Sequence, residues 1–77
     1  MTTREMRRTL SRFFGAMQWQ LSESDGIVRV DYHRTTSHGM RLWDEFASGA
    51  TVDSALRTAC RKSYEIVLQE RMEAQSK

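Results

Sequence analysis

One stretch constrains the fold of this chain more than any other, because it alone is long and periodic enough to carry a core. Between Thr51 and Gln75, apolar and small residues recur with helical spacing at Val52, Ala55, Leu56, Ala59, Cys60, Ser63, Ile66 and Val67. At about 100° per residue these positions form one stripe. Thr51 is suited to cap the helix, Asp53 places negative charge in its first turn, and Gly49 ends the preceding element. We therefore predict one long helix over about residues 52–75.

The length of this helix limits the rest of the molecule. At 1.5 Å per residue it spans about 36 Å, which exceeds the diameter of the body that the remaining residues can build. We therefore expect its end to project. The chain has 77 residues and is predicted to be a single domain (1–77), near the size at which one core only just outweighs chain entropy. Self-association as a homodimer, or a partner protein, would compensate.

A second helix is predicted at the N-terminus, over about residues 3–14. Thr2 and Glu5 have the spacing of a capping box, and Gly15 is the expected stop. One face is apolar and consists of Met6, Leu10, Phe13, Phe14 and Met17. Arginines dominate the rest of the surface: Arg4, Arg8 and Arg12 on the opposite face and Arg7 on its flank. This arginine stripe fits either contact with phosphate or an acidic partner, or an ordinary solvated face.

From Ala16 onward the hydrophobic period changes to two. Apolar residues alternate with polar ones at Met17, Trp19, Leu21, Val28, Val30 and Tyr32. The Asp25-Gly26 pair between the two alternating runs predicts a β-hairpin over about residues 16–34. Its apolar face should pack on the helices. The other face is left to water or to a partner, and it carries Gln18, Gln20, Arg29, Asp31 and His33.

The segment 40–47 fits two structures. A short helix would place three apolar residues on one side: Leu42, Trp43 and Phe46. A short third strand would instead alternate Met40 and Leu42 around an outward Arg41. We favour the helix because the segment also contains poor strand formers, Asp44, Glu45 and Ala47. The predicted fold class is therefore α+β, with an N-terminal helix, a two-stranded antiparallel β-hairpin, a short helix and a long C-terminal helix.

The long helix carries a second apolar row. Tyr64, Leu68 and Met72 lie at i, i+4 and i+8, roughly 130° around from the main stripe, with Arg71 beside them. Either the first helix or Trp43 covers this row, or the row is a helix-in-groove or dimer contact. Fraying of the helix end is a third explanation.

The residue types needed for catalysis or metal binding do not converge. His33 and His38 are separated by a strand end and a loop, and Cys60 lies on the apolar stripe, where we expect a buried thiol in a reducing compartment. No nucleophile elbow or nucleotide-binding loop occurs. We therefore predict a protein that is not an enzyme and holds no cofactor or metal. No apolar run approaches the ~18 residues of a membrane span, so a cytoplasmic location with no membrane contact is expected.

The charge is unevenly distributed along the chain. The formal net charge is +2. Residues 1–41 hold seven arginines against four acids, whereas residues 42–77 hold five basic residues against six acids. Ten of the twelve basic residues are arginine, which favours bidentate contact with phosphate or carboxylate. The basic half is therefore the first half.

In size and layout the chain resembles the small single-domain inhibitors encoded by phages and mobile elements, anti-CRISPR proteins among them. The resemblance rests on a helix, an Asp-Gly hairpin and further helices within 77 residues. It implies a protein partner, a host macromolecular defence complex, that is inhibited by masking its nucleic-acid groove or by blocking recruitment of a nuclease. The predicted partner-binding residues are Arg4, Arg7, Arg8, Arg12, Arg29, His33, Tyr64, Leu68 and Met72.

The alternative is a small nucleic-acid-binding regulator. The arginine stripe would lie on the phosphate backbone, and a dimer formed through Tyr64, Leu68 and Met72 would present two such helices. A hairpin follows the first helix directly, so the sequence contains no helix-turn-helix. The two interpretations differ in their expected sensitivity to salt.

Overall fold

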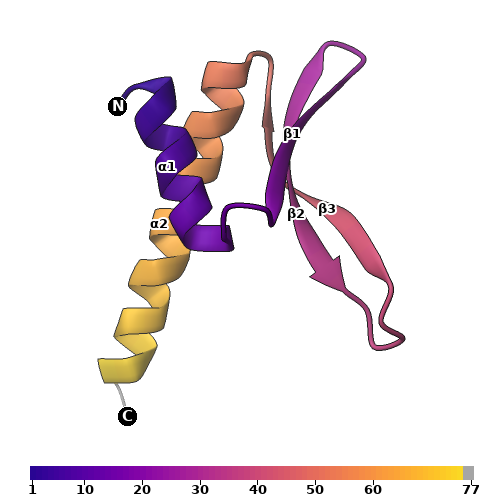
Figure 1. The fold of residues 1–77 in the computed structure, drawn as a ribbon. Coiled ribbons are helices and arrows are strands. Elements are labelled where there is room, and N and C mark those ends of the chain that lie inside the picture. Colours follow the sequence, from indigo (N-terminus) through magenta and orange to yellow (C-terminus); the bar gives the residue numbers. More distant parts are fainter. Residues whose placement is uncertain (76–77) are drawn as a thin grey trace.

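The computed structural model describes residues 1–75. It contains five elements in the order α1 (Thr3–Phe14), β1 (Trp19–Ser24), β2 (Ile27–Thr35), β3 (Arg41–Gly49) and α2 (Val52–Gln75). The strands form one antiparallel sheet in the order β1-β2-β3. Both helices pack on the same face of the sheet and run in the same direction, and the other face is uncovered (Figure 1). The fold class α+β is confirmed.

The two predicted terminal helices are present, and their caps follow the sequence signals. At α1 the Thr2 hydroxyl accepts a hydrogen bond from the Glu5 N–H at 3.2 Å, and the Glu5 carboxylate accepts in return from Thr2. Gly15 ends α1 with a φ of +102°, a conformation that side chains disfavour. At α2 the Thr51 hydroxyl accepts from the Ser54 N–H at 3.1 Å.

The predicted β-hairpin is also present, as β1 and β2. Its turn places Asp25 at φ +54° and Gly26 at φ +75°, the pair of positive angles that a tight two-residue hairpin requires. Trp19 pairs with Tyr32 and Leu21 with Val30, so the apolar side chains of the two strands share the face that meets the helices.

The prediction of a short helix over residues 40–47 is wrong. This segment is strand β3, which pairs with β2 and makes the sheet three-stranded. A register shift opposite Val30 and Asp31 leaves Phe46 unpaired between Ala47 and Glu45, so Phe46 and Ala47 both reach the core. The surroundings of the poor strand formers explain why they are tolerated in a strand. Asp44 forms an ion pair with Arg34, and Glu45 forms one with Arg29. Ala47 is small enough to lie beneath a helix.

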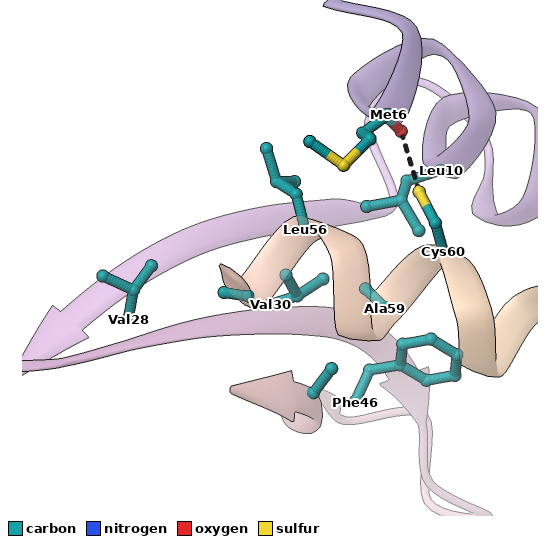
Figure 2. Close-up of a cluster of buried hydrophobic side chains, with 10 residues drawn as sticks. Met6, Leu10, Val28, Val30, Phe46, Leu56, Ala59 and Cys60 are labelled. Carbon is teal, nitrogen blue, oxygen red and sulfur yellow. Dashed lines mark hydrogen bonds between the residues drawn. The ribbon is translucent and has the colours of Figure 1, made fainter. Parts of the chain in front are cut away.

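The core lies between the sheet, α1 and the first half of α2. Its buried members are Met6, Leu10, Val28, Val30, Phe46, Ala47, Ala55, Leu56, Ala59 and Cys60. Figure 2 shows that α1 contributes from one side of α2 and the strands from the other. The Cys60 thiol donates to the Met6 carbonyl at 3.5 Å, and burial raises the pKa of that thiol. Cys60 is therefore a structural side chain that joins the first and last helices.

The last part of α2 projects beyond this core, as its length predicts. Every residue from 68 to 75 is exposed, and in Figure 1 this part of α2 extends past the end of α1. Within residues 1–75 no helix has both the length and the apolar character needed to cross a membrane.

Candidate functional site

The predicted binding residues lie on two separate faces of the molecule. The arginine stripe of α1 and the row on α2 belong to the helical layer, whereas Arg29 and His33 belong to β2. The side-chain alternation places the last two on the sheet face away from the helices. The structure therefore does not unite all the predicted residues in one site.

The apolar row on α2 is exposed. The exposed fractions are 67% for Tyr64, 49% for Leu68 and 69% for Met72. Neither α1 nor Trp43 covers the row. Residues of α1 lie beside Tyr64 and Leu68 but leave both exposed, and Trp43 stacks on His33 at the opposite face of the sheet. Three medium-sized or large apolar side chains that follow one another on a single helix face form a patch of the kind that binds other proteins.

A groove runs between α1 and α2 beside this row. Its volume is about 820 Å³, and it is lined by Thr9, Arg12, Phe13, Ser63, Tyr64, Val67, Leu68, Glu70 and Arg71. The structure thus brings Arg12 of the arginine stripe together with Tyr64 and Leu68 of the row. We call this feature the interhelical groove.

Two further hollows lie along the same helix. One of about 480 Å³ includes Met1, Met6, Arg61, Tyr64 and Leu68, and another includes Glu65, Leu68, Gln69, Met72 and Glu73. Leu68 lines all three hollows. It is therefore the centre of the exposed surface on α2.

The arginine stripe is exposed along its whole length. Arg7 differs from the other three, since its guanidinium lies over the Trp19 ring at 5.6 Å from the centroid. Within residues 1–75 no ion pair engages Arg4, Arg8 or Arg12. A nearby acid, Glu5, accepts hydrogen bonds from the Thr2 side chain and backbone, which lower the pKa of its carboxyl. The positive charge of the stripe is thus available to a partner.

The uncovered face of the sheet holds a polar network. Asp31 accepts from Ser22 at 2.8 Å and from Arg29 at 3.1 Å. The Arg29 Nε atom lies 3.3 Å from a Glu45 carboxylate oxygen, without the alignment of a hydrogen bond. Asp31 is only 3% exposed, so the expectation that this side chain faces water or a partner is wrong. Arg29 is engaged internally as well.

His33 lies beside this network, stacked on Trp43 with ring centroids 3.9 Å apart. Trp43 is 39% exposed and faces away from the helices, a position that the helix predicted for residues 40–47 could not reveal. Within residues 1–75 no group of three His, Cys, Asp or Glu is placed to hold a metal ion.

The sequence analysis did not identify the interhelical groove. Phe13 and Val67 were assigned to apolar faces that pack inward, and both are only half-buried. The available signal was the difference in helix length, which leaves the end of α2 without a neighbour.

Comparison with protein-family models, curated proteins and solved structures finds no match for this chain. The kind of partner is therefore inferred from the chemistry of the exposed surfaces themselves.

Proposed function

We propose that this chain is a small non-enzymatic protein-binding module whose main contact is the exposed row of Tyr64, Leu68 and Met72. The observation that supports this most is the position of Leu68, which is half-exposed, lies where the projecting part of α2 begins and borders three hollows. An apolar residue with hollows on both sides provides what the core of an interface needs, a side chain to bury and space for the partner's side chains.

In its more specific form, the proposal is a phage-type or mobile-element-type inhibitor that sterically blocks a host defence complex in the cytoplasm, similar to anti-CRISPR proteins. Its support is the size of the chain and its layout of helix, hairpin and long helix. The projecting end of α2 adds to this support, because it is thin enough to enter a recess on a larger partner. The same row is also the surface through which a homodimer would form.

The test is a tagged pull-down from host lysate, divided into nuclease-treated and untreated halves. We expect one stoichiometric protein complex to survive nuclease treatment with the natural chain and to be lost with Leu68→Asp. Ala74→Asp is the matched control, because it adds the same charge to the projecting part of α2, about 120° around the helix from Leu68. Capture that persists with Leu68→Asp, or that fails for the natural chain, contradicts the proposal.

A nucleic-acid-binding regulator is the second candidate. It is favoured by Arg4, Arg8 and Arg12, which lie one helical turn apart on an exposed face and make no ion pair within residues 1–75. Phosphate binding would weaken steeply between low and physiological salt and would be lost in Arg8→Glu/Arg12→Glu. Leu68→Asp would remove at most the contribution of a dimer formed through Tyr64, Leu68 and Met72. Recovery of heterogeneous nucleic acid alone, with everything lost on digestion, would favour this candidate.

A further inference from the structure

We propose that the interhelical groove binds an acidic amphipathic helix of a partner protein, with apolar side chains on the groove floor and carboxylates on Arg12 and Arg71. This inference rests on the proposed function and names the class of its partner. It differs from the exposed row alone because it assigns a role to charges from both helices.

The inner part of the groove is mainly apolar. Phe13 from α1 and Val67 from α2 are half-buried there, whereas Tyr64 and Leu68 are exposed. The hydroxyls of Thr9 and Ser63 also border it, and each donates a hydrogen bond to a backbone carbonyl of its own helix. Phe13 is held in place by edge contact with Phe14 at 4.8 Å between ring centroids and by Phe46 at 5.9 Å. Because these aromatic neighbours fix the floor, an apolar side chain entering the groove meets a preformed surface.

The rims of the groove are predominantly basic. Arg12 borders it on the α1 side and Arg71 on the α2 side, against one acid, Glu70. Arg8 lies one turn before Arg12 on the same exposed face. Among the described residues, neither groove arginine takes part in an ion pair. Guanidinium groups on opposite rims therefore favour an occupant with carboxylates on both flanks of an apolar strip.

The shape of the groove favours a helical occupant. It is bounded lengthwise by two helices that run in the same direction. A helix presents apolar side chains from one face at i, i+3 and i+4, about 5–6 Å apart, which suits an apolar strip with a charged residue on each side. This is the helix-in-groove mode of recognition.

A second copy of this chain is a less complementary occupant. Its own exposed row is flanked by two arginines, Arg61 and Arg71, and by three acids, Glu65, Glu70 and Glu73, so its charge is mixed. Arginines on both rims of the groove instead favour a chain whose apolar strip is flanked by carboxylates alone.

The experiment uses a fluorescein-labelled synthetic peptide of about 18 residues, since much shorter isolated helices are marginal in water. The peptide carries leucines at i, i+4, i+7 and i+11 and glutamates on both flanks. The comparison peptides are a version with every glutamate replaced by lysine and a scrambled acidic version. Binding to the 77-residue chain is measured by fluorescence anisotropy, and the site is mapped by amide chemical shifts.

The natural chain is expected to bind the acidic amphipathic peptide at least about tenfold more tightly than either comparison peptide. Arg12→Glu/Arg71→Glu should reverse this preference and select the lysine peptide. Arg34→Glu/Arg41→Glu is the matched control, because it makes the same change of charge at two exposed arginines of the sheet, outside the groove. Should the double reversal unfold the chain, Arg12→Gln/Arg71→Gln provides a neutral variant that is expected to lose the preference without reversing it.

The inference is overturned if the acidic peptide does not bind, if both charged peptides bind equally, or if the shifts map outside the groove. It is also overturned, in favour of nucleic acid, if a DNA or RNA duplex displaces the peptide and is lost with Arg12→Glu/Arg71→Glu but not with Leu68→Asp. Its failure is distinct from failure of the proposed function. If a lysate partner is lost with Leu68→Asp but is still captured by Arg12→Glu/Arg71→Glu, the proposed protein-binding function holds. Only the inference that the partner is an acidic helix is then wrong.

Discussion

Leu56 and Leu68 are the same residue type on the same helix, but their environments are opposite. Leu56 is fully buried between α1 and the sheet, and Leu68 is 49% exposed on the projecting part. The apolar surface of Leu56 contributes to folding, whereas part of the surface of Leu68 is available for burial against a partner. Substitutions at Leu56 are therefore expected to affect stability, and substitutions at Leu68 are expected to affect binding.

Leu56→Ala is expected to lower the free energy of unfolding by about 2–5 kcal/mol, because it removes buried methyl groups and leaves a cavity. Leu68→Ala is expected to change it by less than about 1 kcal/mol. Urea unfolding followed by circular dichroism measures both. Equal losses in the two variants would contradict the environments described above.

Side-chain alternation in the sequence identified Val28 and Val30 as core residues, and it failed for Asp31. Alternation assigns a residue to a face of the sheet, and Asp31 does lie on the face away from the helices. Its carboxylate accepts hydrogen bonds from Ser22 of the neighbouring strand β1 and from Arg29, two residues before it on β2. The contact with Ser22 crosses strands and so depends on register, which the pattern within one strand does not determine.

At the level of elements, the sequence was sufficient for the helices and the hairpin because their signals are local. Caps, an Asp-Gly turn and a long apolar stripe act within a few residues of one another. Strand β3 has no comparable local signal, since its stability comes from pairing with β2 and from the contacts of Phe46 and Ala47 with the core. The interhelical groove was missed for the same reason, because it exists only where two distant helices meet.

The junction between β3 and α2 is tightly packed at Gly49. A β-carbon at this position would lie 2.7 Å from the Ala55 amide nitrogen and would also collide with the Ser54 hydroxyl. Gly49→Ala is therefore expected to lower the free energy of unfolding by about 1–3 kcal/mol, as overpacking against backbone does.

The matched control for this prediction is Ser48→Ala, a change at the neighbouring exposed position of the same strand. Thermal unfolding of both variants provides the measurement. Equal stability of Gly49→Ala and Ser48→Ala would contradict the prediction. It would mean that the first turn of α2 can move away from the added β-carbon at no cost in free energy.

At the level of the whole molecule, the chain is less compact than its length requires. The radius of gyration is 13.7 Å, against roughly 11.5 Å expected for a compact domain of this size. The projecting end of α2 and the tips of both β-hairpins extend away from the core (Figure 1), which raises the radius of gyration. The molecule therefore consists of a small core with extensions from α2 and from the sheet.

Ending the chain after Val67 is expected to leave the core folded, because residues 68–75 are all exposed. The free energy of unfolding should fall by no more than about 1 kcal/mol, the scale of changes outside a core, while capture of a protein partner is lost. Chemical denaturation and the lysate pull-down measure the two effects on one protein. Loss of the fold would show that the projecting part of α2 stabilises the core, contrary to its exposure.

The pairing of the first helix with the last also determines when this chain can fold during its synthesis. Met6 and Leu10 are covered by α2, where the contact between Met6 and Cys60 joins residues 54 positions apart. Until α2 has left the ribosome, the nascent chain holds α1 and the sheet strands without their cover. Contacts between residues so distant in sequence slow folding, and the uncovered apolar surface makes the unfinished chain prone to aggregation. Folding of this protein is therefore expected to be completed only after translation of α2.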